Sequence, residues 1–180
     1  EQKHMKGFTT KALHTGYKPN TEDGAIIPPL HLSTTFQSGN FGKYDYSRTV
    51  NPTRIILEQT LASLDGNSFG LAYSSGSSAL ANIVALLKQD EITLFSSDAY
   101  GGTYRFIVRV AGNQGIKYKI VDLTDYVKTE AVLKIGGIKI IWVETPSNPL
   151  LKVVDILSLS KLAKKYKSLL VVENTFASPV

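Results

Sequence analysis

The chain has 180 residues, a formal net charge of +5, 43% hydrophobic residues and 19% charged residues, a balance typical of a soluble globular protein and not of a disordered one. The sequence contains no cysteine, which excludes disulfide bonds and thiolate chemistry in these residues. No apolar run approaches the length of a membrane span and no secretory signal opens the chain, so we expect a cytoplasmic protein without membrane contact.

Nucleic-acid and metal binding are not expected either. The basic residues are dispersed, and the densest group lies on and just after a predicted helix, where it complements the negative helix end: Lys161, Lys164, Lys165 and Lys167. No nucleic-acid recognition motif accompanies them. The three histidines have no metal-ligand spacing: His4, His14 and His31.

Residues 1–50 are rich in glycine and proline and show few periodic signals, which predicts a long segment without secondary structure of its own. The segment ends in two phenols and an arginine, at Tyr44, Tyr46 and Arg48. One interpretation is an arm that brings Arg48 and Tyr46 to an anion elsewhere, since a guanidinium is a permanent, planar donor. The other is a surface arm with a chance aromatic cluster.

From Asn51 onward the pattern becomes regular. Asn51 and Pro52 are typical of a helix start, and Gly66 of its end. Strands are then predicted over 69–73, 92–95, 116–121, 138–143 and 169–172, and helices over 77–88, 103–113, 126–135 and 156–166. This alternation predicts an α/β fold: a three-layer sandwich with a mainly parallel sheet covered by helices on both faces.

The run Ser74-Ser75-Gly76-Ser77 joins the first of these strands to a helix. A small-residue turn at a helix N-terminus exposes backbone N–H groups to an anion. The alternative is an ordinary capped turn.

Polar groups also follow the other strands, among them Asp98, Tyr100, Glu144, Asn148 and Glu173. Carboxyl ends of parallel strands meet at one edge, where such sheets bind ligands. Together these groups would hold a flat, phosphorylated, nitrogen-bearing ring. The dinucleotide and nucleoside-triphosphate motifs GxGxxG and GxxxxGK[ST] are both absent.

Several motifs resemble a known family. They are Tyr46-Ser47-Arg48, Asn51-Pro52-Thr53-Arg54, Ser75-Gly76, the stretch 98–103, the run WVETPSNP at 142–149 and Asn174-Thr175-Phe176. They resemble the Cys/Met-metabolism pyridoxal-phosphate enzymes, the transsulfuration enzymes, in order and spacing from about residue 10 to residue 179. The likeness is strongest to cystathionine γ-lyase and cystathionine γ-synthase.

The resemblance implies the aspartate-aminotransferase-like fold (fold type I of the pyridoxal-phosphate enzymes). Residues 1–50 would be an arm reaching the neighbouring subunit, and 51–180 an incomplete cofactor-binding large domain, without the small C-terminal domain. We accordingly expect a homodimer, usually within a homotetramer.

The resemblance also assigns roles to single residues. Gly76 and Ser77 would bind the cofactor phosphate, and Tyr100 would stack on the pyridine ring as a catalytic residue. The other expected cofactor contacts are Tyr46, Ser47 and Arg48, which reach the neighbouring subunit's phosphate, together with Glu173 and Thr175. The expected substrate contacts are Arg105, Asn148 and Glu144; an alternative for Glu144 is an ion pair at the sheet edge.

Two departures from the family pattern affect these expectations. Glu173 stands where the family has an aspartate that pairs with the pyridinium nitrogen, and its extra methylene predicts slower chemistry. The family's cofactor-binding lysine, in a Ser-x-Thr-Lys motif, is not among these residues, so the 180 residues alone are expected to be inactive. We interpret the chain as a fragment of the enzyme, or else as a non-catalytic relative stabilised by a partner.

The expected activity is γ-elimination from cystathionine or related sulfur amino acids, with γ-replacement, as in cystathionine γ-synthase, as the alternative. Methionine γ-lyase fits less well, because Gly102 stands where that enzyme usually has a cysteine. Cystathionine β-lyases and sulfhydrylases fit the stretch 46–54 less well. A hypothesis of another class is a truncated, non-catalytic subunit of the same fold.

Overall fold

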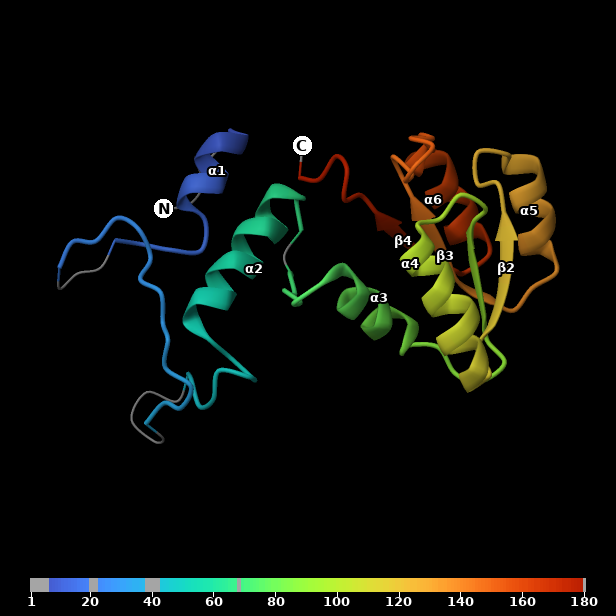
Figure 1. The fold of residues 1–180 in the computed structure, drawn as a ribbon. Coiled ribbons are helices and arrows are strands. Elements are labelled where there is room, and N and C mark those ends of the chain that lie inside the picture. The colour runs from blue at the N-terminus through green and yellow to red at the C-terminus, as the bar shows by residue number, and fades with distance from the viewer. Residues whose placement is uncertain (1–6, 20–22, 38–42, 68, 180) are drawn as a thin grey trace. The chain divides into compact units, whose positions relative to one another are not determined.

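A computed structural model describes residues 7–19, 23–37, 43–67 and 69–179. The chain divides into two compact units, one reaching to Ala72 and the other running from Tyr73 to Ser178 (Figure 1). No helix in the described ranges combines the length and apolar character needed to cross a lipid bilayer.

The first unit is built on helices α1 (Phe8–His14) and α2 (Pro52–Leu64), which contact each other. α2 begins as its sequence predicts, with the Asn51 side chain accepting the N–H of Thr53 at 2.9 Å. The expectation that the first fifty residues lack secondary structure is wrong for α1. This helix buries none of its residues, so it leaves no periodic apolar stripe to recognise.

The strand predicted over 69–73 is also wrong, because this segment is irregular. Phe69 is 91% exposed and Leu71 75% exposed, and no strand in the described part of the chain pairs with the segment. The segment instead follows α2: the Ala72 N–H donates to Glu58 Oε1 at 2.9 Å, and Gly70 lies against the Glu58 carbonyl. An apolar run becomes a strand only where a neighbouring ladder accepts its backbone hydrogen bonds.

The second unit contains a four-stranded, fully parallel sheet of order β2-β1-β3-β4. Its strands are β1 (Ile92–Ser96), β2 (Lys117–Val121), β3 (Ile138–Glu144) and β4 (Leu169–Glu173). The four corresponding predicted strands are therefore confirmed to within one residue at either end.

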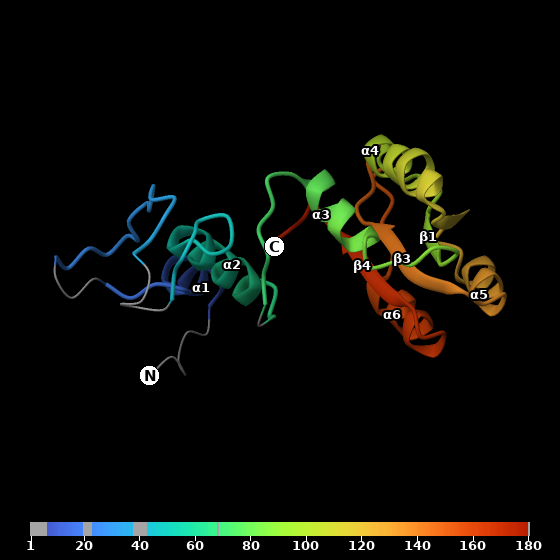
Figure 2. The same cartoon turned by 90° about the horizontal axis from the view of Figure 1, so that it is seen from below.

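Helices cover both faces of this sheet (Figure 2). They are α3 (Gly76–Val84), α4 (Gly101–Arg105) with its continuation as a π-helix η2 (Phe106–Ala111) and a 3₁₀ turn η3 (Gly112–Gln114), α5 (Tyr126–Lys134) and α6 (Ile156–Lys165). α3 and η2 pack on one face, and α5 and α6 on the other. The three-layer α/β prediction is confirmed, although α3 ends four residues earlier than the predicted 77–88.

The central strands are buried on both sides, which explains their uninterrupted apolar sequences. Leu94 and Ile141 point into the core under α5 and α6, while Phe95 and Trp142 point into the core under α3 and η2. Successive strand residues face opposite sides, so a strand covered on both faces needs apolar residues throughout.

Candidate active site

The strand order places a topological switch point between β1 and β3, the position at which open parallel sheets form a ligand crevice. From β1 the chain passes to β2 on one side, and from β3 it passes to β4 on the other. The segments that follow β1 and β3 therefore diverge at the carboxyl edge, which is where open parallel sheets bind their ligands. Asp98 and Tyr100 follow β1, while Thr145 to Asn148 follow β3.

The N-terminus of α3 offers a cradle for an anion. Ser75 caps the helix, its Oγ accepting the N–H of Ser78 at 3.1 Å. The N–H groups of Gly76 and Ser77 donate to no acceptor in the described part of the chain. A Cβ on Gly76 would meet nothing within 4 Å. Free donors, the positive helix end and open space fit a phosphate group.

Tyr100 stands at the start of α4, beside the crevice. Its side chain is 52% exposed, and its N–H donates to Glu144 Oε2 at 2.5 Å. A Cβ on Gly102 would lie 2.7 Å from Tyr100 Cε1, so the ring rests against a position that only glycine can occupy without movement. The tyrosine thus presents an exposed aromatic ring whose backbone is held by Glu144. α3 contacts α4 on this face of the sheet.

Glu144 is a buried carboxylate, 1% exposed, at the end of β3. Besides the Tyr100 N–H, it accepts the hydroxyl of Thr103 through Oε1 at 2.6 Å. No ion pair to Glu144 occurs among the described residues. The carboxylate is held by hydrogen bonds, and not by the ion pair that was the alternative expectation for this residue. The arrangement anchors the first turn of α4 to the sheet. A direct contact between Glu144 and substrate stays a prediction.

Glu173 lies opposite Glu144, at the end of β4. Its Oε1 accepts the N–H of Thr175 at 2.9 Å and also the Thr175 hydroxyl. Oε2 has no hydrogen-bond partner within the ranges the structure covers. One oxygen is therefore held by the following turn, and the other remains available to a ligand.

The two remaining candidates of this unit, Arg105 and Asn148, are less constrained. Arg105 is exposed, and its Nη1 lies close to Gly101, 3.2 Å from where a Cβ would stand. Asn148 is half-buried in the loop after β3. Neither side chain makes a hydrogen bond to another described residue, so both are free to contact a ligand.

Tyr46, Ser47 and Arg48 belong to the first unit, whereas the other candidates belong to the second. The Arg48 guanidinium lies over the Tyr46 ring, 4.9 Å from its centroid. The backbone is fixed: the Ser47 N–H donates to Thr34 O at 2.8 Å, and Arg54 Nη1 donates to Ser47 O at 2.9 Å. Arg48 itself is exposed on this ordered turn. The contact with a neighbouring subunit stays a prediction.

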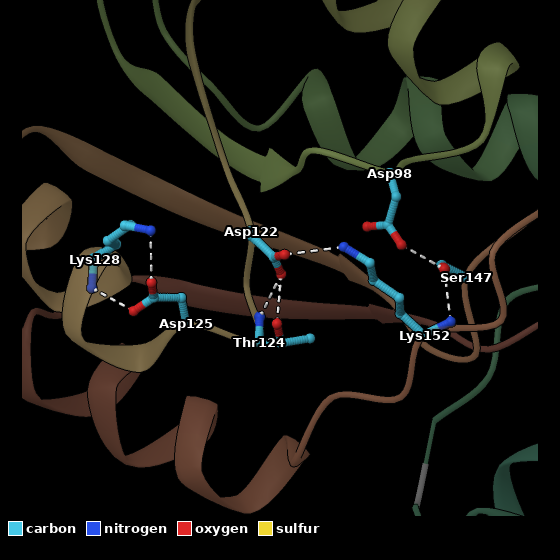
Figure 3. Close-up of polar contacts among 7 residues, drawn as sticks. All are labelled: Asp98, Asp122, Thr124, Asp125, Lys128, Ser147 and Lys152. Atoms are coloured by element: carbon cyan, nitrogen blue, oxygen red, sulfur yellow. Dashed lines mark hydrogen bonds and ion pairs between the residues drawn. The ribbon is translucent and has the colours of Figure 1, made fainter.

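A polar network at the carboxyl edge was not recognised from the sequence (Figure 3). Ser147 Oγ donates to Asp98 Oδ2 at 2.5 Å, and Lys152 Nζ forms an ion pair with Asp122 Oδ2 at 2.9 Å. Hydrogen bonds from the Thr124 hydroxyl, and then from Lys152, lower the pKa of Asp122 to about 2. Each of these polar residues follows a predicted strand, and this placement is the only sequence signal that could have indicated that they form a network.

Comparison with known proteins identifies the family. The model of the Cys/Met metabolism PLP-dependent enzymes matches residues 9–180. The chain belongs to this family. It is 37% identical to a probable cystathionine γ-synthase of Herpetosiphon aurantiacus over 96% of this chain and 55% of that protein. It is 38% identical to a cystathionine β-lyase of Lactococcus lactis subsp. cremoris, over 97% of this chain and 47% of that protein.

The fold comparison agrees with this assignment. The crystal structure of a cystathionine γ-lyase from Lactobacillus plantarum, complexed with L-serine, superposes with a TM-score of 0.90 at 37% identity. The match covers 96% of this chain and 46% of that one. The expected aspartate-aminotransferase-like fold is confirmed. The chain spans about half the length of the curated relatives it matches.

Members of the Cys/Met metabolism family depend on pyridoxal phosphate, and the residues present fit this cofactor. The open α3 terminus suits its phosphate, the exposed Tyr100 ring suits its flat pyridine, and the half-buried Glu173 carboxylate suits its ring nitrogen. All three lie in the second unit.

Proposed function

We propose that the protein carrying this chain is a pyridoxal-phosphate-dependent transsulfuration enzyme that removes the γ-substituent of cystathionine or a related sulfur amino acid. The observation that carries the proposal is the α3 terminus, where Gly76 and Ser77 offer free N–H groups into open space. The family assignment supports the chemistry, and its members depend on the same cofactor.

When bound, pyridoxal phosphate withdraws electrons from the α-carbon of an attached amino acid. The chain's own residues hold and orient it in the proposed site. Gly76 and Ser77 donate N–H groups to the phosphate, and Tyr100 covers the ring. Glu144 fixes Tyr100 through the backbone. Glu173 places its free oxygen near the ring nitrogen, where a negative charge keeps a proton on that nitrogen.

Substrate and subunit contacts complete the proposal. Arg105 and Asn148 are free donors suited to the amino acid's carboxylate or to the cofactor. Tyr46 and Arg48 would reach the phosphate of a neighbouring subunit, which makes the functional unit a homodimer, usually within a homotetramer. The exposed Arg48 on its ordered turn supports this role.

A Gly76→Ala substitution tests the cofactor site in the protein that carries this chain. Gly76 has open space around its Cα position and a helical environment, so alanine should leave the free energy of unfolding nearly unchanged. The added methyl group would occupy the space before the helix N-terminus and weaken pyridoxal-phosphate binding on the order of tenfold. Gly112→Ala is the matched control, because a Cβ there makes an ordinary 3.5 Å contact. Equal cofactor affinity in both variants would remove the support for this site.

Product analysis with cystathionine separates the activities. γ-Elimination releases cysteine, whereas β-elimination releases homocysteine. γ-Replacement requires an activated homoserine and cysteine as substrates. Release of homocysteine alone would replace the proposed γ-elimination by β-elimination. Cofactor binding without turnover of any of these substrates would indicate the non-catalytic subunit.

A further inference from the structure

The crevice between the diverging segments is bridged at two places. One is Glu144, which binds the first turn of α4. The other is the hydrogen bond that Ser147 Oγ donates to Asp98 Oδ2 at 2.5 Å (Figure 3). We call this second bridge the Asp98–Ser147 latch. It joins the segment that continues to Tyr100 with the loop that continues to Asn148.

Ser147 is also the closing point of its own loop. Its Oγ accepts the backbone N–H of Lys152 at 3.0 Å, and its N–H donates to Lys152 O at 3.0 Å. The Leu151 N–H donates to Ser147 O at 2.9 Å. Ser147 has no exposed surface, and Asn148 lies inside the closed loop. The position of Ser147 therefore determines the position of Asn148.

The direction of the hydrogen bonds gives the latch its specificity. A serine hydroxyl has one proton, and the Lys152 N–H already occupies a lone pair of Ser147 Oγ. The proton is left for Asp98, whose side-chain oxygen accepts it at 2.5 Å. The chain from Lys152 through Ser147 to Asp98 is polarised in one direction, so each bond strengthens the next.

We infer that Asp98 and Ser147 are positioning residues, whose hydrogen bond sets the distance between Asn148 and Tyr100 across the crevice. The consequence for the cofactor rests on the proposed function. Neither residue needs to touch a ligand. Loss of the latch lets the loop after β3 move away from the start of α4, which displaces two ligand-contacting groups relative to each other.

The test uses Ser147→Ala, which removes both the donor to Asp98 and the acceptor of the Lys152 N–H, and Asp98→Asn, which keeps an acceptor oxygen. Asp98→Ala removes the acceptor of the same hydrogen bond. Asp98 is less buried than Ser147, so this variant replaces Ser147→Ala if Ser147→Ala does not fold. Lys152→Met is the matched control: it removes the partly buried ion pair with Asp122 but keeps the backbone N–H that Ser147 accepts. All variants are made in the protein that carries this chain.

Two readouts separate positioning from stability. The first is the hydrogen-exchange rate of the Lys152 amide in cofactor-free protein. The second is the dissociation constant of pyridoxal phosphate, measured together with the circular dichroism of the cofactor's absorption band. The dichroism reports the orientation of the cofactor ring. We expect Ser147→Ala and Asp98→Ala to accelerate exchange and to raise the dissociation constant, each on the order of tenfold, with a changed dichroism band. Asp98→Asn and Lys152→Met should remain within about twofold of the wild type.

Unchanged exchange, or an unchanged dissociation constant and dichroism, in Ser147→Ala and Asp98→Ala would overturn the inference. So would Asp98→Asn behaving like Asp98→Ala, because charge and not the hydrogen bond would then matter. A wild-type protein that binds no cofactor would overturn the proposed function instead. The exchange rate of the Lys152 amide in cofactor-free Asp98→Ala would then decide whether the latch holds the loop, because Ser147→Ala removes the acceptor of that amide directly.

Discussion

Glu144 and Glu173 lie directly opposite each other at the ends of the neighbouring strands β3 and β4, with side chains on the same face of the sheet. Each carboxylate is held by its own donors: Glu144 by the start of α4, and Glu173 by Thr175. The two differ in what remains free. Both Glu144 oxygens are used within the fold, whereas Glu173 keeps one oxygen for a ligand.

Glu144→Gln should lower the free energy of unfolding by about 1–3 kcal/mol. Both buried oxygens of Glu144 accept hydrogen bonds, and glutamine replaces one of them by an amide nitrogen, which cannot accept. Urea unfolding measures this change. Glu130→Gln is the control: Glu130 accepts hydrogen bonds from Lys165 Nζ and the Tyr166 hydroxyl at the surface, where solvent screens the interaction, so the substitution should cost clearly less than Glu144→Gln. Equal losses in the two variants would contradict the anchoring role of Glu144.

Glu173→Asp should raise turnover in the full-length protein. The shorter side chain removes the displacement that the extra methylene imposes on the ring or the backbone, and a displacement of about 1 Å costs as much as about a hundredfold in rate. Steady-state kinetics with the preferred sulfur amino acid measures the effect, with Glu130→Asp as a remote control. A rate equal to or below that of the wild type would show that Glu173 suits this site as it is.

Asp122→Asn should reduce the loss in free energy of unfolding that occurs as the pH falls from neutral to about 2. The pKa of Asp122 falls from its ordinary 3.8 to about 2 on folding, chiefly through the Thr124 hydroxyl and then Lys152. A depressed carboxyl pKa stabilises the fold above pH 3.8, and this contribution is lost as the pH falls through about 2. Because the side chain is 40% exposed, the contribution should stay below about 1 kcal/mol.

Unfolding of wild type and Asp122→Asn at a series of pH values between neutral and pH 2 isolates this group from the other carboxylates. The two curves should converge at the acid end. A constant offset over the whole range would show that Asp122 acts through something other than its charge.

Leu151→Gly should stabilise the second unit, and Leu151→Val should destabilise it. Leu151 has a φ of +54°, a left-handed conformation that costs a side-chain-bearing residue about 1–2 kcal/mol. Glycine removes that strain but is more flexible in the unfolded chain, which leaves a net gain of about 0.5 kcal/mol. Leu151 is 60% exposed, so little packing is lost. Thermal unfolding in which valine equals or exceeds glycine would contradict the strain at this position.

The sequence predicts those parts of the fold that local pattern determines. Runs such as Ile138–Glu144 and the helix cap at Asn51 identify their elements, because apolar periodicity and cap chemistry act within a few residues. The segment 69–73 has the same apolar character, yet it is irregular. A strand also depends on a neighbour, which its own residues do not encode.

The candidate site divides in the same way. Tyr100, Glu144 and Glu173 could be located because strand ends of a parallel sheet meet at one edge. The Asp98–Ser147 latch could not be predicted, since it joins residues 49 positions apart and depends on how far two loops diverge. Thr103 was missed because its role lies in a hydrogen bond to a buried carboxylate on another element.

The strand order β2-β1-β3-β4 also determines when the sheet can be completed during synthesis. β1 can pair with β2 early, but its other neighbour, β3, leaves the ribosome only after β2 and α5. Until then one edge of β1 displays unpaired backbone groups beside Leu94 and Phe95, which are fully buried in the finished fold. The nascent chain therefore passes through a period in which its central strand is open to chaperones or to pairing with another chain.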